Sequence, residues 1–155
     1  MASLVAFPLA TLLIAACAPS SAQDGSNSDL PALPPGAGYV KDIAKATRDN
    51  ENYRRVLVTG PHMQLVLMTL QRGEEIGLET HSHGDQFIRV EAGTGRATLN
   101  GNAYPLQPGT VVVIPAGVAH NVINTGSSPL QMYFLYSPPE HRPGTVQRTK
   151  AEAQH

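Results

Sequence analysis

The chain consists largely of short apolar segments separated by turn-forming residues, a pattern that is typical of β-strands. In Gln86–Ala92, the apolar Ile88 and Val90 share one face with Gln86, because alternate side chains of a strand point the same way. The stretch Met63–Gln71 is apolar on both faces, which predicts a strand buried on both sides. The expected strands are Val56–Thr59, Met63–Gln71, Ile76–Ser82, Gln86–Ala92, Arg96–Leu99, Ala103–Leu106, Thr110–Ile114, His120–Asn124 and Leu130–Tyr136. Many short strands at regular spacing predict an all-β fold, either a sandwich or a closed barrel.

Turn signals define how some of these strands are joined. Asn100-Gly101 lies between two expected strands, and this dipeptide favours a two-residue hairpin with a type I′ turn. A second turn is expected at Gly84–Asp85. Upstream of the strands, Tyr39–Arg55 carries mixed charge and is expected to form one short helix or an N-terminal arm.

Composition limits the function more than the fold. At 155 residues the chain is long enough for one domain plus tails. A formal net charge of −1 and the lack of a basic block argue against nucleic-acid binding. With no Trp and only 5% aromatic residues, a stacking platform for bases or large sugars is not expected either. The single cysteine excludes an intramolecular disulfide.

The N-terminal segment has the character of an export signal. Leu4–Ala16 is mostly apolar but too short to span a membrane, which predicts a secretory signal peptide over residues 1–22. The sequence Ile-Ala-Ala before Cys17 resembles the lipobox of bacterial lipoproteins, in which the cysteine is lipidated and becomes the mature N-terminus. The alternative is ordinary cleavage after Ala18 or Ala22. Either route predicts an exported protein of the bacterial cell envelope, periplasmic or lipid-anchored, with that anchor as its only membrane contact.

Metal-capable side chains are concentrated between residues 73 and 93. Glu79, His81 and His83 are spaced two apart, so they would share one face of a strand. Gln86 lies on an apolar face, where a polar amide needs a buried partner. A bound metal ion would be one such partner.

Two motifs carry a resemblance to the cupin superfamily. Gly109–Asn124 has the spacing Gly, five residues, Pro, one, Gly, two, His, three, Asn, and so resembles the second cupin signature at every defining position. The first signature is Gly, five residues, His-x-His, three or four residues, Glu, six residues, Gly. The segment from Gly73 to Gly93 has this frame, with Glu79 in place of the first His and Gln86 in place of the Glu.

The resemblance implies a single cupin jelly-roll barrel that holds a divalent transition metal. The implied ligands are Glu79, His81, Gln86 and His120. A shifted register that uses His83 instead of Glu79 remains an alternative, as does a cupin without metal. Imidazole, carboxylate and amide ligands suit manganese, iron, nickel, copper or zinc. The expected function is a metal-dependent enzyme of dioxygenase or isomerase type that acts on a small oxygenated molecule. The alternative is a non-catalytic sensor or binding protein.

The resemblance covers the barrel, and composition divides the rest of the chain into parts. The predicted organisation is a signal in residues 1–22, a flexible linker in 23–38, a short N-terminal arm in 39–55, the cupin barrel in 56–137 and a flexible C-terminal tail in 138–155. In the tail, His141 and Arg142 are expected to be exposed loop residues, with closure over the barrel mouth as the alternative. The tail also resembles that of small bacterial cupins labelled mannose-6-phosphate isomerase-like. A homodimer is expected, because the short strand Val56–Thr59 would leave an unpaired edge.

Overall fold

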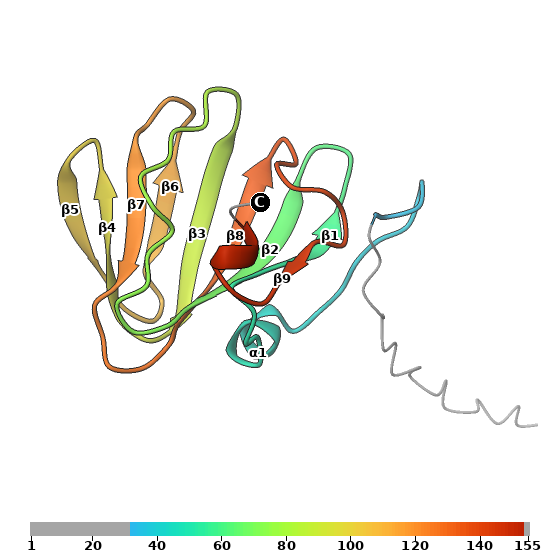
Figure 1. Ribbon diagram of the computed structural model, residues 1–155. Helices are drawn as coiled ribbons and strands as arrows, with labels where there is room; N and C mark the ends of the chain where they lie inside the picture. Colours follow the sequence, from blue (N-terminus) through green and yellow to red (C-terminus); the bar gives the residue numbers. More distant parts are fainter. Residues whose placement is uncertain (1–31, 154–155) are drawn as a thin grey trace, which may run out of the picture.

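Two antiparallel β-sheets make up most of the computed structural model, which describes residues 32–153 (Figure 1). The larger sheet has the strand order β6-β3-β8-β2-β1-β9 and the smaller one β5-β4-β7. The elements are α1 (Ile43–Arg48), β1 (Arg54–Thr59), β2 (Gln64–Leu70), β3 (Asp85–Ala92), β4 (Gly95–Leu99), β5 (Asn102–Leu106), β6 (Val111–Ile114), β7 (His120–Asn124), β8 (Leu130–Ser137), β9 (Val146–Gln147) and a 3₁₀ turn (Ala151–Ala153). This arrangement confirms the predicted all-β jelly roll. The expected signal peptide, with Cys17, and most of the linker lie outside the described residues.

The hydrophobic core lies between the two sheets and follows the predicted alternation. On β3, Ile88 and Val90 are completely buried. On β8, which pairs with β3, every second residue is buried, including Met132 and Phe134. Residues 66–70 of β2 are all buried, which agrees with the expectation that both faces of this strand are covered. Gln86 is also buried, at 3% exposure, on the same inward face of β3 as the apolar residues.

The Asn100-Gly101 turn joins β4 and β5 as predicted. Both residues have positive φ angles, 47° and 83°, which a type I′ turn requires. The two strands pair from Leu99 with Asn102 to Gly95 with Leu106. The sequence therefore determines this hairpin locally.

The predicted strand Ile76–Ser82 is wrong. Within this segment only Glu79 forms an isolated bridge, to His120, and Glu75 just before it forms another, to Ile123, both with β7. Gly77 interrupts regular pairing, because its φ of 100° does not fit a pleated strand and its N–H is donated to the side chain of Asn121 (3.1 Å) instead. The expected turn residue Asp85 is already the first residue of β3.

The N-terminal arm contains one short helix, α1. The Asp42 carboxylate accepts a hydrogen bond from the Lys45 N–H (3.0 Å), which caps the first turn. The other end is held against the larger sheet, since the Gln131 amide donates to the Arg48 carbonyl (2.7 Å). A six-residue helix depends on such tertiary contacts, because its own hydrogen bonds do not offset the cost of nucleation.

The segment after β8 is more ordered than the expected tail. Its strand β9 pairs with Arg54 and Arg55 of β1, and the Thr145 carbonyl accepts from the Val56 N–H (2.8 Å). This segment therefore covers the edge of β1 from Arg54 to Val56, and the expected homodimer stays a prediction. Within residues 32–153, no helix is long and apolar enough to cross a membrane.

Candidate metal centre

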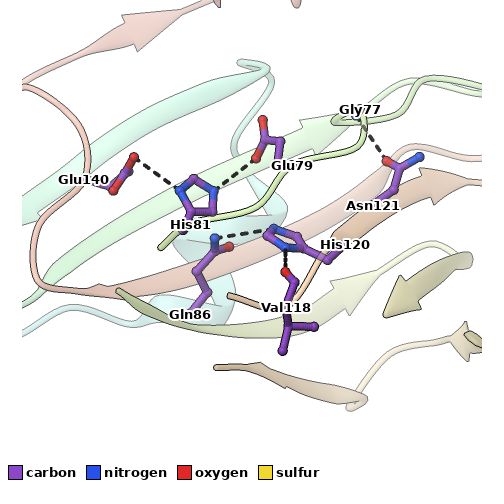
Figure 2. A network of polar contacts seen from close by, with 8 residues as sticks. All are labelled: Gly77, Glu79, His81, Gln86, Val118, His120, Asn121 and Glu140. Carbon is purple, nitrogen blue, oxygen red and sulfur yellow. Dashed lines mark hydrogen bonds and ion pairs between the residues drawn. The ribbon is translucent and has the colours of Figure 1, made fainter. Parts of the chain in front are cut away.

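Three potential metal ligands from distant parts of the sequence converge inside the barrel. Glu79 and His81 lie on the irregular segment before β3, and His120 is the first residue of β7. One ligand atom from each residue lies within 4.8 Å of the other two. Figure 2 shows this cluster together with Gln86 and Glu140. His120 is completely buried, whereas Glu79 and His81 are partly buried.

Backbone hydrogen bonds hold the two motifs in register with each other. The N–H of Glu79 donates to the carbonyl of His120, and the N–H of His120 donates back to Glu79, both at 2.9 Å. The carbonyl of His81 accepts from Gly117 in the Pro-x-Gly turn (2.8 Å). The carboxylate of Asp85 accepts from the N–H of Ala116 in the same turn (2.9 Å). The irregular segment is therefore positioned for its side chains without being a strand.

The hydrogen bonding of His120 determines which of its nitrogens is available. Nδ1 lies 2.9 Å from the carbonyl oxygen of Val118, and a carbonyl can only accept. Nδ1 therefore carries the proton in the neutral ring, and Nε2 presents a lone pair to the site. A metal ligand needs such a lone pair.

Gln86 completes the buried side of the cluster. Its Nε2 lies 3.4 Å from Nε2 of His120, so the amide can donate to the imidazole lone pair (Figure 2). A half-turn of the amide would put its oxygen in the same place, where it could face a cation. The structure thus supplies the buried polar partner that the position of Gln86 on an apolar face requires.

His81 is flanked by two carboxylates. Its Nε2 lies 3.3 Å from Glu79 Oε2, and its Nδ1 lies 3.3 Å from Glu140 Oε1. Both contacts are drawn in Figure 2. The sequence does not predict Glu140, because this residue belongs to the segment after β8 and matches no motif spacing. Its one local signal is a carboxylate directly after Pro138-Pro139.

His83, the alternative ligand, lies apart from the cluster. Its side chain is exposed, and it does not belong to the group whose ligand atoms converge. The chain bends at Ser82 and His83, which breaks the strand alternation that would have put Glu79, His81 and His83 on one face. The geometry favours the register with Glu79, and the ligand assignment itself stays a prediction.

The side chains present fit a first-row divalent metal. Nitrogen and oxygen ligands bind such ions at about 2.0–2.2 Å, so two ligands lie about 3 to 4.4 Å apart. The 3.3 Å between Glu79 and His81 is within this range, and the 4.8 Å limit of the cluster is slightly above it. Small side-chain rotations would close the difference. The donor set is two imidazoles, one carboxylate and one amide, which suits manganese, iron, nickel, copper or zinc.

Two further residues of the barrel interior lie near His81. The ring of Tyr136 is 6.3 Å from that of His81 and 5.0 Å from that of His141, centroid to centroid. Burial, with smaller contributions from the nearby carboxylates Glu79 and Glu140, raises the pKa of Tyr136, so its hydroxyl stays protonated.

The expectation that His141 is an exposed loop residue is wrong, because its main chain is held by buried Gln64 and its ring packs on Tyr136. Arg142 is exposed as expected.

His141 is expected to make the fold less stable in acid. Burial, with smaller contributions from the positive charges of Arg54 and His81, lowers its pKa from 6.5 to about 4. Between these two pH values the unfolded chain binds a proton that the folded chain does not, so stability falls as the pH falls through this window. The contribution is on the order of 2 kcal/mol by pH 4, after allowance for the partial exposure of the ring.

Urea unfolding of the protein at pH 7 and pH 4.5 measures this effect, with His141→Gln as the matched variant. The variant should lose less stability than the unchanged protein over the same interval, because it has no titrating ring at this position. Equal losses would show that His141 does not contribute.

The sequence and the fold are similar to those of known proteins. A family model described as "Cupin domain" matches residues 66–136. The uncharacterized protein YrkC of Bacillus subtilis is 45% identical over 121 residues, which cover 74% of this chain and 65% of that protein. An uncharacterized protein of Acanthamoeba polyphaga mimivirus is 43% identical over 70% of each sequence. The crystal structure of BH2720 from Bacillus halodurans has a TM-score of 0.76 and 43% identity, and the match covers 77% of this chain and 96% of that chain. The family match includes every candidate ligand but ends before Glu140.

Proposed function

The chain belongs to the cupin family, and on that premise we propose that it is a metal-dependent enzyme that acts on a small oxygenated molecule. The observation that carries the proposal is the convergence of Glu79, His81 and His120 within 4.8 Å, with buried Gln86 beside them. Cupins typically bind a divalent metal at such a cluster. Manganese, iron, nickel, copper and zinc are the candidates.

The chain's own residues determine how such a site would work. His120 is held by Val118 and can offer only Nε2, so its contribution is fixed before any metal binds. Glu79 provides the one carboxylate of the set and would offset part of the metal's charge. Gln86 is neutral, which would leave the metal more electrophilic than a second carboxylate would. When bound, the metal would supply Lewis-acid polarisation of a carbonyl or enolate oxygen, or the activation of O₂.

The number of protein ligands supports an enzyme over a purely structural metal site. Four side chains leave up to two positions of a six-coordinate metal for water or substrate. A structural site is more often closed by four strong ligands such as cysteine thiolates. Here the fourth group is an amide, which is a weak ligand and exchangeable.

The proposal is tested by metal reconstitution of the purified protein. Metal-free protein is loaded separately with manganese, iron, nickel, copper and zinc, and the bound metal is counted. Each preparation is then assayed with a panel of small hydroxy and carbonyl compounds, with and without oxygen. We expect one metal per chain and turnover with at least one metal and substrate class. Tight binding of a small molecule that persists after metal removal, without turnover under any condition, would instead identify a binding protein.

A further inference from the structure

We propose that Glu140, in the segment after the barrel, is a positioning residue that orients His81 for metal binding. The inference rests on the proposed metal site and extends it beyond the residues that the cupin motifs contain. Glu140 acts through His81 and is not itself a ligand, because it is not part of the group of converging ligand atoms.

The geometry around His81 defines this role. A neutral imidazole has one N–H and one lone pair. Glu140 lies 3.3 Å from Nδ1 and Glu79 lies equally close to Nε2, and both carboxylates can only accept. Once Nε2 gives its lone pair to a metal beside Glu79, the proton of the neutral ring is on Nδ1, where Glu140 accepts it. Nε2 then presents its lone pair on the side of Glu79, where the ligand atoms converge. His120 is held in the same tautomer by the Val118 carbonyl, so both imidazoles are oriented alike by acceptors outside the ligand set.

The segment that carries Glu140 is itself anchored on both sides. The side chain of Gln64 donates to the His141 carbonyl (2.8 Å) and accepts from the His141 N–H (2.9 Å). Gln64 is completely buried on β2, so this pair of hydrogen bonds is shielded from water. On the other side, the Ser137 hydroxyl donates to the His62 carbonyl (3.0 Å). Glu140 is thus held over His81 by contacts that do not involve the metal site.

The Glu140 side chain contributes little to the fold, which makes the proposal testable. It is 42% exposed, and an ion pair at this exposure adds little to stability. Its removal should therefore leave the fold intact while it frees the His81 ring. Loss of such an outer carboxylate typically costs about ten- to a hundredfold in metal affinity.

The experiment measures cobalt(II) and zinc affinity by titration of the metal-free protein and of three variants. Glu140→Ala should bind both metals about ten- to a hundredfold more weakly. Glu140→Gln keeps an acceptor oxygen at the same place and should restore the affinity to within a few-fold. Glu152→Ala is the matched control, because Glu152 lies in the same C-terminal segment but accepts from the Arg148 N–H (2.8 Å) instead. The visible absorption of the cobalt form should shift in Glu140→Ala, since a freed imidazole changes the coordination geometry, and a structural role alone would not cause this.

The outcomes separate this inference from the proposed function. If the unchanged protein binds metal and Glu140→Ala binds it equally well with the same cobalt spectrum, the inference is wrong and the metal site stands. Thermal unfolding of the metal-free forms measures the stability of Glu140→Ala. If its free energy of unfolding falls by as much as its free energy of metal binding, the residue is structural and the inference is again wrong. If the unchanged protein binds neither metal, the proposed function fails, and the role of Glu140 fails with it.

Discussion

His120→Ala is expected to lower metal affinity by more than about a hundredfold. This exceeds the loss of about ten- to a hundredfold that follows when a residue that only orients a ligand is removed. His120 is completely buried, its tautomer is fixed by Val118, and its backbone pairs in both directions with Glu79. Among the described residues, the buried neighbour of its Nε2 is Gln86, which offers only an amide in its place. The bound metal per chain, measured by elemental analysis after dialysis, provides the readout.

His83→Ala serves as the matched control for this prediction. His83 is exposed and outside the cluster, so its variant should retain a full complement of metal. Because His120→Ala also leaves a cavity, circular dichroism and urea unfolding of the metal-free forms must show that the variant folds. If His83→Ala empties the site while Glu79→Ala does not, the shifted register is correct and Glu79 is not a ligand.

Gly93→Ala is expected to destabilise the fold by about 3 to 5 kcal/mol, which places it among the most damaging single substitutions. Gly93 follows β3 with a φ of +80°, a conformation that costs a side chain about 1 kcal/mol or more. In addition, a Cβ there would lie 2.3 Å from the carbonyl oxygen of Pro129 and 2.8 Å from Cα of Leu130. Both are backbone atoms and cannot rotate away, so the chain before β8 would have to shift.

Gly101→Ala separates the two causes of this effect. Gly101 has nearly the same φ, +83°, but nothing within 4 Å of the added Cβ. Its variant should lose only the conformational part, about 1 kcal/mol. Urea denaturation of both variants and the unchanged protein gives the two free energies of unfolding. Equal losses would mean that the close approach of Gly93 to Pro129 does not contribute.

This steric requirement explains the last glycine of the first motif. Gly93 lies where the chain leaves β3, and its contact with the Pro129 carbonyl brings the start of β8 against the end of β3. Asn124, the last residue of the second motif, has a similar structural task. Its buried amide donates to the carbonyls of Leu70 and Ser128, both at 2.9 Å. Both motif ends therefore maintain the barrel rather than contact a ligand.

The strands could be predicted because their signals are local. The alternation of Ile88 and Val90, the two apolar faces of β2 and the Asn100-Gly101 turn each depend on neighbouring residues alone. The motif spacings likewise identified the positions of Glu79, His81, Gln86 and His120. What they could not determine is that Ile76–Ser82 is irregular, because the side chain of Asn121, more than forty residues later, takes the N–H of Gly77.

By itself, the sequence determined the all-β fold, the β4–β5 hairpin and the polar side chains that could meet a metal. Only the tertiary structure decided which of them converge, since His83 and Glu79 are equivalent on an ideal strand and differ only because the chain bends at Ser82 and His83. It also brought Glu140 to His81 across nearly sixty residues, through the anchoring of His141 by Gln64. Contacts of this kind arise from the packing of whole strands, and no short stretch of sequence contains them.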